Sequence, residues 1–140
     1  MIELDTFTQG YIDCALWAES AGIDIADDGT VTENPESDTS FERHNFDAGD
    51  IAPESLARIV AECAQFQEAN ARLLAIADRL RPNFADDAQH GYDFWLTRNG
   101  HGAGFWDRGY RFGIGDALTQ AASDYGSSYM YYVNGKIYVS

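Results

Sequence analysis

The stretch DFWLTRNGHGAGFWDR, residues 93–108, contains two of the three tryptophans of the chain, two arginines, a histidine and three glycines. Its first half continues a helix that Asp86 or Asp87 can cap, because a side-chain carboxylate accepts hydrogen bonds from the free amides of a first helical turn. Asn99 and Gly100 predict the end of that helix, since both residue types tolerate the left-handed conformation found at helix ends. A capped helix followed by a glycine-rich segment is therefore the feature around which we expect the fold to be built.

The alternating glycines Gly100, Gly102 and Gly104 leave two interpretations open. Repeated glycine permits positive φ and close approach of the backbone, at a cost in conformational entropy. In the first interpretation the glycines form a tight turn that returns Phe105 and Trp106 to the preceding helix. In the second they surround a ligand or partner site on a glycine-lined backbone.

The residues of that candidate site are Arg98, His101, Trp106, Asp107 and Arg108. A histidine with an aspartate and a nearby hydroxyl suits general-base chemistry, and arginines near tryptophans can stack or bind an anion. The structural alternative is that these arginines pair with nearby acids such as Asp93 and Asp107 and stabilise the fold.

The same run resembles a motif of a family of small, mostly uncharacterised proteins carried by bacteriophages, prophages and plasmids. The resemblance extends to residues 51–55, to residues 115–119 and to the tyrosine-rich C-terminal segment, and it covers most of the chain outside residues 26–48. It implies a mobile-element setting for the protein. It implies no activity, no cofactor and no catalytic residue.

The charge of the chain is strongly negative and unevenly distributed. The net charge is −14, and residues 1–57 carry fourteen acids against Arg43, whereas the remainder carries nine acids against seven arginines and Lys136. Such a balance opposes direct binding of nucleic acid, which requires basic residues to replace the counterions of the phosphates. We weigh two interpretations, a solvated acidic face and an acidic surface that competes with nucleic acid for a basic groove on a partner protein.

Residues 23–50 are polar and rich in turn-forming residues, which predicts a long surface loop held down by Phe41 and Phe46. Most of the acids of the N-terminal part lie here. The candidate acidic surface consists of Asp24, Asp27, Asp28, Glu33, Glu36, Asp38, Asp47 and Asp50. A calcium loop is disfavoured, because Ala26 and Pro35 occupy positions where the ligand pattern requires oxygen ligands.

Several classes of function lack their sequence signatures. The chain has no nucleophile elbow, no phosphate-binding loop, no HExxH motif and no dinucleotide-binding glycine pattern. Its three histidines are scattered, so we expect no metal or cofactor, and Cys14 and Cys63 are expected to be buried free thiols. No apolar run approaches the length of a membrane span and the N-terminus does not resemble a signal peptide, so we expect a cytoplasmic protein.

Helical periodicity predicts helices over residues 5–20, 53–80 and 113–126. Residues 53–80 are expected to form a long central helix of one bundle. The alternative is a coiled-coil contact between two copies of the chain, with Asn70 in the seam. Trp17 is expected to anchor the first helix in the core. Asn134-Gly135 between β-forming residues predicts a C-terminal hairpin, for which Phe105-Trp106 is the candidate third strand.

These features predict a single α+β domain, mostly helical, with a long central helix and a C-terminal hairpin. The function we expect is that of a non-enzymatic mobile-element protein that binds a host or viral protein, with the acidic surface imitating nucleic acid. The alternative is a small-molecule-binding or hydrolytic protein with its site in residues 98–107.

Overall fold

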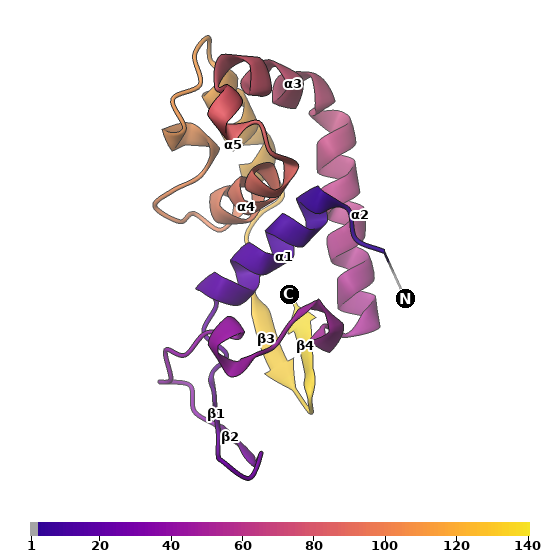
Figure 1. Cartoon of the computed structure of the whole chain (residues 1–140), viewed down its shortest axis with the longest axis vertical. Coiled ribbons are helices and arrows are strands. Elements are labelled where there is room, and N and C mark those ends of the chain that lie inside the picture. The colour runs from indigo at the N-terminus through magenta and orange to yellow at the C-terminus, as the bar shows by residue number, and fades with distance from the viewer. Residues whose placement is uncertain (1–2) are drawn as a thin grey trace.

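The computed structural model describes residues 3–140 and has a mostly helical α+β fold, as the sequence predicts (Figure 1). The helices are α1 (Thr6–Ala18), α2 (Pro53–Ala69), α3 (Ala71–Leu80), α4 (Asp87–Arg98) and α5 (Ile114–Ser123), and the strands are β1 (Ile23–Ile25), β2 (Val31–Glu33), β3 (Met130–Val133) and β4 (Lys136–Val139). Four short 3₁₀ helices connect them, η1 (Glu42–His44), η2 (Ala48–Asp50), η3 (Pro82–Phe84) and η4 (Phe105–Asp107). No helix in residues 3–140 combines the length and the apolar character needed to cross a membrane.

Helices α1 and α4 pack closely against each other, and two glycines make this approach possible. A Cβ atom on Gly10 of α1 would overlap the backbone of Ala88, and one on Gly91 of α4 would overlap the carbonyl oxygen of Phe7. Both glycines therefore mark close packing contacts between the two helices. The Asp86 side chain caps α4, as the sequence indicates, and the Asp5 side chain caps α1 in the same way.

An aromatic cluster fills the core beneath this helix pair. The ring of Phe66 stacks on Phe94 with centroids 4.2 Å apart and on Phe105 at 5.8 Å, and the ring of Phe7 lies 5.9 Å from Phe66 and 6.0 Å from Phe94. Each of these rings is almost completely buried. The core therefore joins α1, α2, α4 and η4, which are distant in sequence.

The long central helix expected over residues 53–80 is interrupted at Asn70. The backbone of Asn70 leaves the helical region, with φ −117° and ψ 18°, and α3 continues in a different direction from α2 (Figure 1). The amide and the side chain of Asn70 both donate to the carbonyl oxygen of Phe66 at 3.0 Å, and the side-chain bond closes the end of α2. The bend allows α3 to pack against α5, which a straight helix would not do.

The C-terminal hairpin of β3 and β4 has the predicted Asn134-Gly135 turn, with positive φ at both residues, as a type I′ turn requires. Its expected pairing with Phe105-Trp106 is wrong, because those residues belong to η4. Strand β4 instead meets the segment before α2, where the amide of Ala52 donates to the carbonyl oxygen of Ile137 at 2.7 Å. This backbone contact fixes the hairpin against the start of α2.

Residues 23–50 are more ordered than the predicted surface loop. Strands β1 and β2 form a second hairpin, whose turn is stabilised by the Asp28 side chain accepting from the amide of Thr30 at 2.9 Å. The three-residue strands are too short to give a visible alternation of polar and apolar residues, so only the turn could be recognised in the sequence. Phe41 is fully buried, as expected, and Phe46 packs against the core behind it. We call residues 23–38 the acidic arm, which extends from one end of the molecule in Figure 1.

Candidate functional site

The guanidinium group of Arg98 is buried inside the fold and does not face a surface site. It donates to the carbonyl oxygens of Gly126 at 2.8 Å and Tyr125 at 3.2 Å, and to the Glu62 carboxylate at 2.8 Å. A fourth hydrogen bond reaches the hydroxyl of Tyr11. Because four of the five N–H donors of a guanidinium are thus engaged, Arg98 serves as a link between α4, α2 and the end of α5.

Arg108 forms an ion pair with the fully buried carboxylate of Asp93. Its Nη2 donates to one carboxylate oxygen at 2.7 Å, and its Nε lies 3.2 Å from both oxygens. Burial raises the pKa of Asp93, while the hydrogen bonds from Arg108 oppose that rise. The expectation that this arginine pairs with a nearby acid is confirmed, and the pair locks η4 to α4.

The glycine-rich turn is held by the side chains around it. The Asp107 carboxylate accepts from the amide of Gly104 at 3.1 Å, and the hydroxyl of Thr97 accepts from the amide of Phe105 at 3.1 Å. A Cβ atom on Gly104 would overlap that hydroxyl. Gly100 has φ 68° and ends α4, with the amide of His101 bonded back to the carbonyl oxygen of Leu96. This geometry matches the first interpretation, a turn that returns Phe105 to the preceding helix.

Three members of the candidate site, His101, Trp106 and Asp107, are exposed, and Asp107 is the one of them that holds the turn. The imidazole of His101 lies over the buried indole of Trp95, with ring centroids 4.8 Å apart, and the Trp106 side chain is 52% exposed. Trp106 therefore does not fold back with Phe105 as expected. Within residues 3–140 no hydrogen bond or ion pair joins Arg98, His101 and Asp107, so the residues proposed for one site have three separate roles.

The three histidines do not gather into a metal site. The Nε2 atom of His44 lies 3.1 Å from the carbonyl oxygen of Ile23, and that of His90 lies 2.6 Å from the Asp78 carboxylate. In the part of the chain that the structure describes, no group of three histidine, cysteine or acidic side chains is placed to hold an ion.

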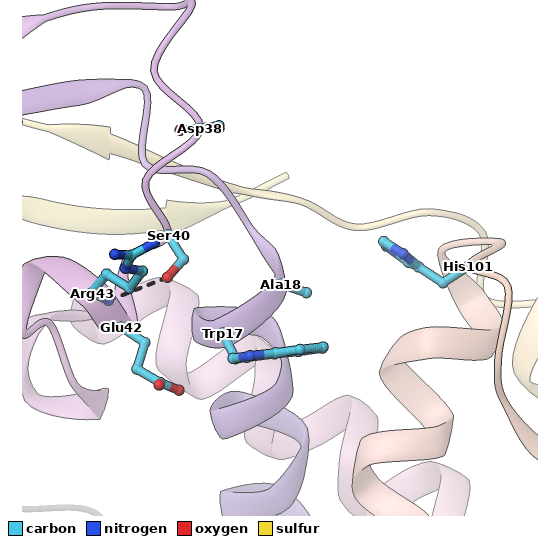
Figure 2. Close-up of a pocket in the computed structure, with 7 residues that line it drawn as sticks. All are labelled: Trp17, Ala18, Asp38, Ser40, Glu42, Arg43 and His101. Carbon is cyan, nitrogen blue, oxygen red and sulfur yellow. Dashed lines mark hydrogen bonds between the residues drawn. The ribbon is translucent and has the colours of Figure 1, made fainter.

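A surface hollow beside Trp17 is the feature that the sequence did not reveal. Trp17 is 55% exposed and is not in the core as expected, because it lies off the stripe of Phe7, Tyr11 and Ala15 that faces α4. The hollow has a volume of about 480 Å³, and Figure 2 shows the residues that line it, Trp17, Ala18, Asp38, Ser40, Glu42, Arg43 and His101. A second hollow of about 470 Å³ shares Trp17 and His101 with the first. Trp17 therefore stands between two depressions.

The acids of the predicted acidic surface divide into two groups. Asp24, Asp27, Asp28, Glu33, Glu36 and Asp38 are exposed on the acidic arm, which contains no lysine, arginine or histidine. Asp47 and Asp50 instead satisfy the backbone of η2, where each carboxylate accepts a hydrogen bond from an amide of the turn. The arm therefore carries six carboxylates with no compensating cation.

Four carboxylates of the arm accept no hydrogen bond within residues 3–140, those of Asp27, Glu33, Glu36 and Asp38, which makes them free to meet a partner. Near the arm's tip, the paired residues Ile25 and Val31 are also partly exposed. Comparison of the chain with protein-family models, with curated proteins and with solved structures found no match.

Proposed function

We propose that the protein is a non-enzymatic accessory protein of a bacteriophage or other mobile element, acting in the cytoplasm of the host cell. It binds a basic surface of a host or viral protein through the acidic arm and takes the place of nucleic acid there. The observation that carries the proposal is the arm itself, six exposed carboxylates on a projecting hairpin without a cation.

The physical basis is electrostatic. A nucleic-acid-binding groove presents lysines and arginines arranged to meet closely spaced phosphates, and a run of carboxylates offers the same sign of charge on a fixed scaffold. The remaining acids of residues 1–57 add to the negative field around the arm. At physiological ionic strength this field is screened beyond about 8 Å, so it speeds association and selects basic surfaces without supplying all of the affinity.

The alternative function, ligand binding or hydrolysis at residues 98–107, receives less support. Arg98, Arg108 and Asp107 use their polar atoms on backbone and side-chain partners within the fold. His101→Ala discriminates between the two functions. A hydrolytic site should lose its activity with the fold intact, whereas a charge mimic should keep its binding.

The experiment compares two variants of equal charge. The arm variant carries Asp27→Asn, Glu33→Gln and Glu36→Gln, which leave the hydrogen bonds within the arm intact. The control variant carries Glu54→Gln, Glu68→Gln and Asp116→Asn, three exposed acids outside the arm. Each tagged protein is used to capture partners from nuclease-treated host lysate at low and high salt, and the captured protein is then purified and assayed for nucleic-acid binding.

We expect the wild type and the control variant to retain the same nucleic-acid-binding protein at low salt and to displace nucleic acid from it. The arm variant should lose both properties. Capture without displacement, or equal behaviour of the two variants, would contradict the proposal.

A further inference from the structure

We infer that the hollow beside Trp17 is the anchoring part of this interface and that it takes an arginine side chain of the protein partner. The inference rests on the proposed function and specifies the chemistry that the partner must present. Neither the acidic arm alone nor the negative charge of the chain would distinguish an arginine from a lysine, whereas this hollow does.

The indole of Trp17 is a fixed platform. It projects from the last turn of α1 into the space between η1 and the loop that carries His101 (Figure 2). The ring of Tyr92 supports it from α4, with centroids 6.4 Å apart. Because the glycine contacts hold α1 tightly on α4, the two rings keep their relative positions before any partner binds.

The walls of the hollow supply acceptors for a cation. Asp38 belongs to the end of the acidic arm and Glu42 opens η1, and both residues are exposed and line the hollow (Figure 2). The hydroxyl of Ser40 accepts from the amide of Arg43 at 3.2 Å and so fixes the start of η1. Arg43 is the one cation on this wall, and its exposed guanidinium can pair with an acid of the partner next to the bound arginine.

Arginine fits this combination better than other occupants. Its planar guanidinium stacks on an indole face and donates several hydrogen bonds in the plane to carboxylates, whereas the lysine ammonium is a strongly hydrated point charge. A nucleic-acid base would bring its phosphates close to the uncompensated carboxylates of the acidic arm, which repel them. A second copy of the chain offers no strongly basic region, since residues 58–140 have a balance of nine acids against eight basic residues.

The acidic arm and the hollow then contribute to binding in different ways. The arm attracts a basic surface over a distance, and the Trp17 contact holds it, as buried tryptophan–arginine contacts commonly do in protein interfaces. Asp38 is shared between the two, which places the hollow directly beside the base of the arm.

The test uses an arginine-rich peptide and a lysine-rich peptide of the same length and charge, added to the full chain at low salt. The chain has three tryptophans, and Trp17→Phe and Trp106→Phe assign their indole N–H signals in a proton–nitrogen NMR spectrum. Trp106 is a matched reference, since its exposure of 52% is close to the 55% of Trp17 and it lines neither hollow.

We expect the arginine peptide to shift the Trp17 signal saturably and the Trp106 signal hardly at all, with a weaker effect of the lysine peptide. Trp17→Ala should weaken arginine-peptide binding by about tenfold, and Trp106→Ala by less than about twofold. Both side chains are half exposed, so neither substitution should unfold the protein.

The outcomes separate the two proposals. If Trp17→Ala binds like the wild type while the arm variant binds more weakly, the anchoring role of the hollow is wrong and the acidic-arm function stands. If the lysine peptide acts as strongly on Trp17 as the arginine peptide, the preference for arginine is wrong. If neither peptide binds, both proposals fail.

Discussion

At the scale of single residues, the unusual composition of residues 93–108 is explained by contacts within the fold. Arg108 pairs with Asp93, Asp107 holds the amide of Gly104, and Thr97 holds that of Phe105. Each residue type is required by its contact, a planar guanidinium for a buried carboxylate and a side-chain oxygen for a free amide. A motif with residue types that are common in active sites can therefore serve to stabilise a turn.

The buried pair gives the first prediction. Asp93→Asn should lower the free energy of unfolding by about 2–4 kcal/mol, because it leaves the guanidinium of Arg108 without its counter-charge in a mostly buried position. Asp107→Asn is the control. Asp107 is 3.9 Å from the same guanidinium and partly exposed, so its loss should cost at most about 1 kcal/mol. Urea denaturation of both variants measures the difference, and equal losses would contradict the assigned role of Asp93.

The local pairs could be predicted from the sequence, whereas the distant ones could not. Asp93 and Arg108 lie close in the chain, and their pairing was expected as the structural alternative to a site. The partners of Arg98 on Glu62 and Gly126 depend on how α2 and α5 pack around α4, and no local pattern contains that information. For the same reason, His101 and Arg98 belong to one motif but face different surroundings.

At the scale of elements, the contact of α1 with α4 depends on the absence of two side chains. Gly91→Ala should destabilise the fold by about 1–3 kcal/mol, since its methyl group would overlap the carbonyl oxygen of Phe7 and force the helices apart. Gly102→Ala is the matched control, because a Cβ atom there meets nothing within 4 Å. We expect that substitution to leave the stability unchanged or to raise it by up to about 1 kcal/mol. Thermal denaturation followed by circular dichroism compares the two variants.

Element ends were predicted well because their signals are local. The cap Asp86 and the Asn134-Gly135 turn each act within a few residues. The break at Asn70 was missed because asparagine fits a helical stripe, and the packing of α3 on α5 depends on residues far away in the sequence. The exposure of Trp17 was missed because a periodicity does not say how wide the buried face is.

At the scale of the whole molecule, buried ionisable groups set its response to alkaline pH. Cys14 and Cys63 are fully buried, as expected, and burial raises the pKa of each thiol from 9.0 to about 12. Between pH 9 and pH 12 both thiols are deprotonated in the unfolded chain and still protonated in the folded chain. The contribution of these groups to stability is therefore complete below pH 9 and is lost as the pH rises toward 12.

We accordingly expect the free energy of unfolding to fall steadily from pH 9 to pH 12. In the double variant Cys14→Ala/Cys63→Ala the fall should be shallower, although the stability at pH 7 should be lower because two core side chains are truncated. Denaturation with urea at a series of pH values gives both slopes. Identical slopes would show that the two thiols do not titrate in this way.

The contact between α1 and α4 also bears on the route by which the chain folds. Residues 10 and 88 meet through their backbones across a large loop, whose closure costs more chain entropy than the local formation of α2 and α3. Docking of the two glycine-bearing helices is thus the natural late event of folding. A larger side chain at Gly91 should then raise the unfolding rate and leave the refolding rate nearly unchanged, a partition that stopped-flow kinetics can resolve.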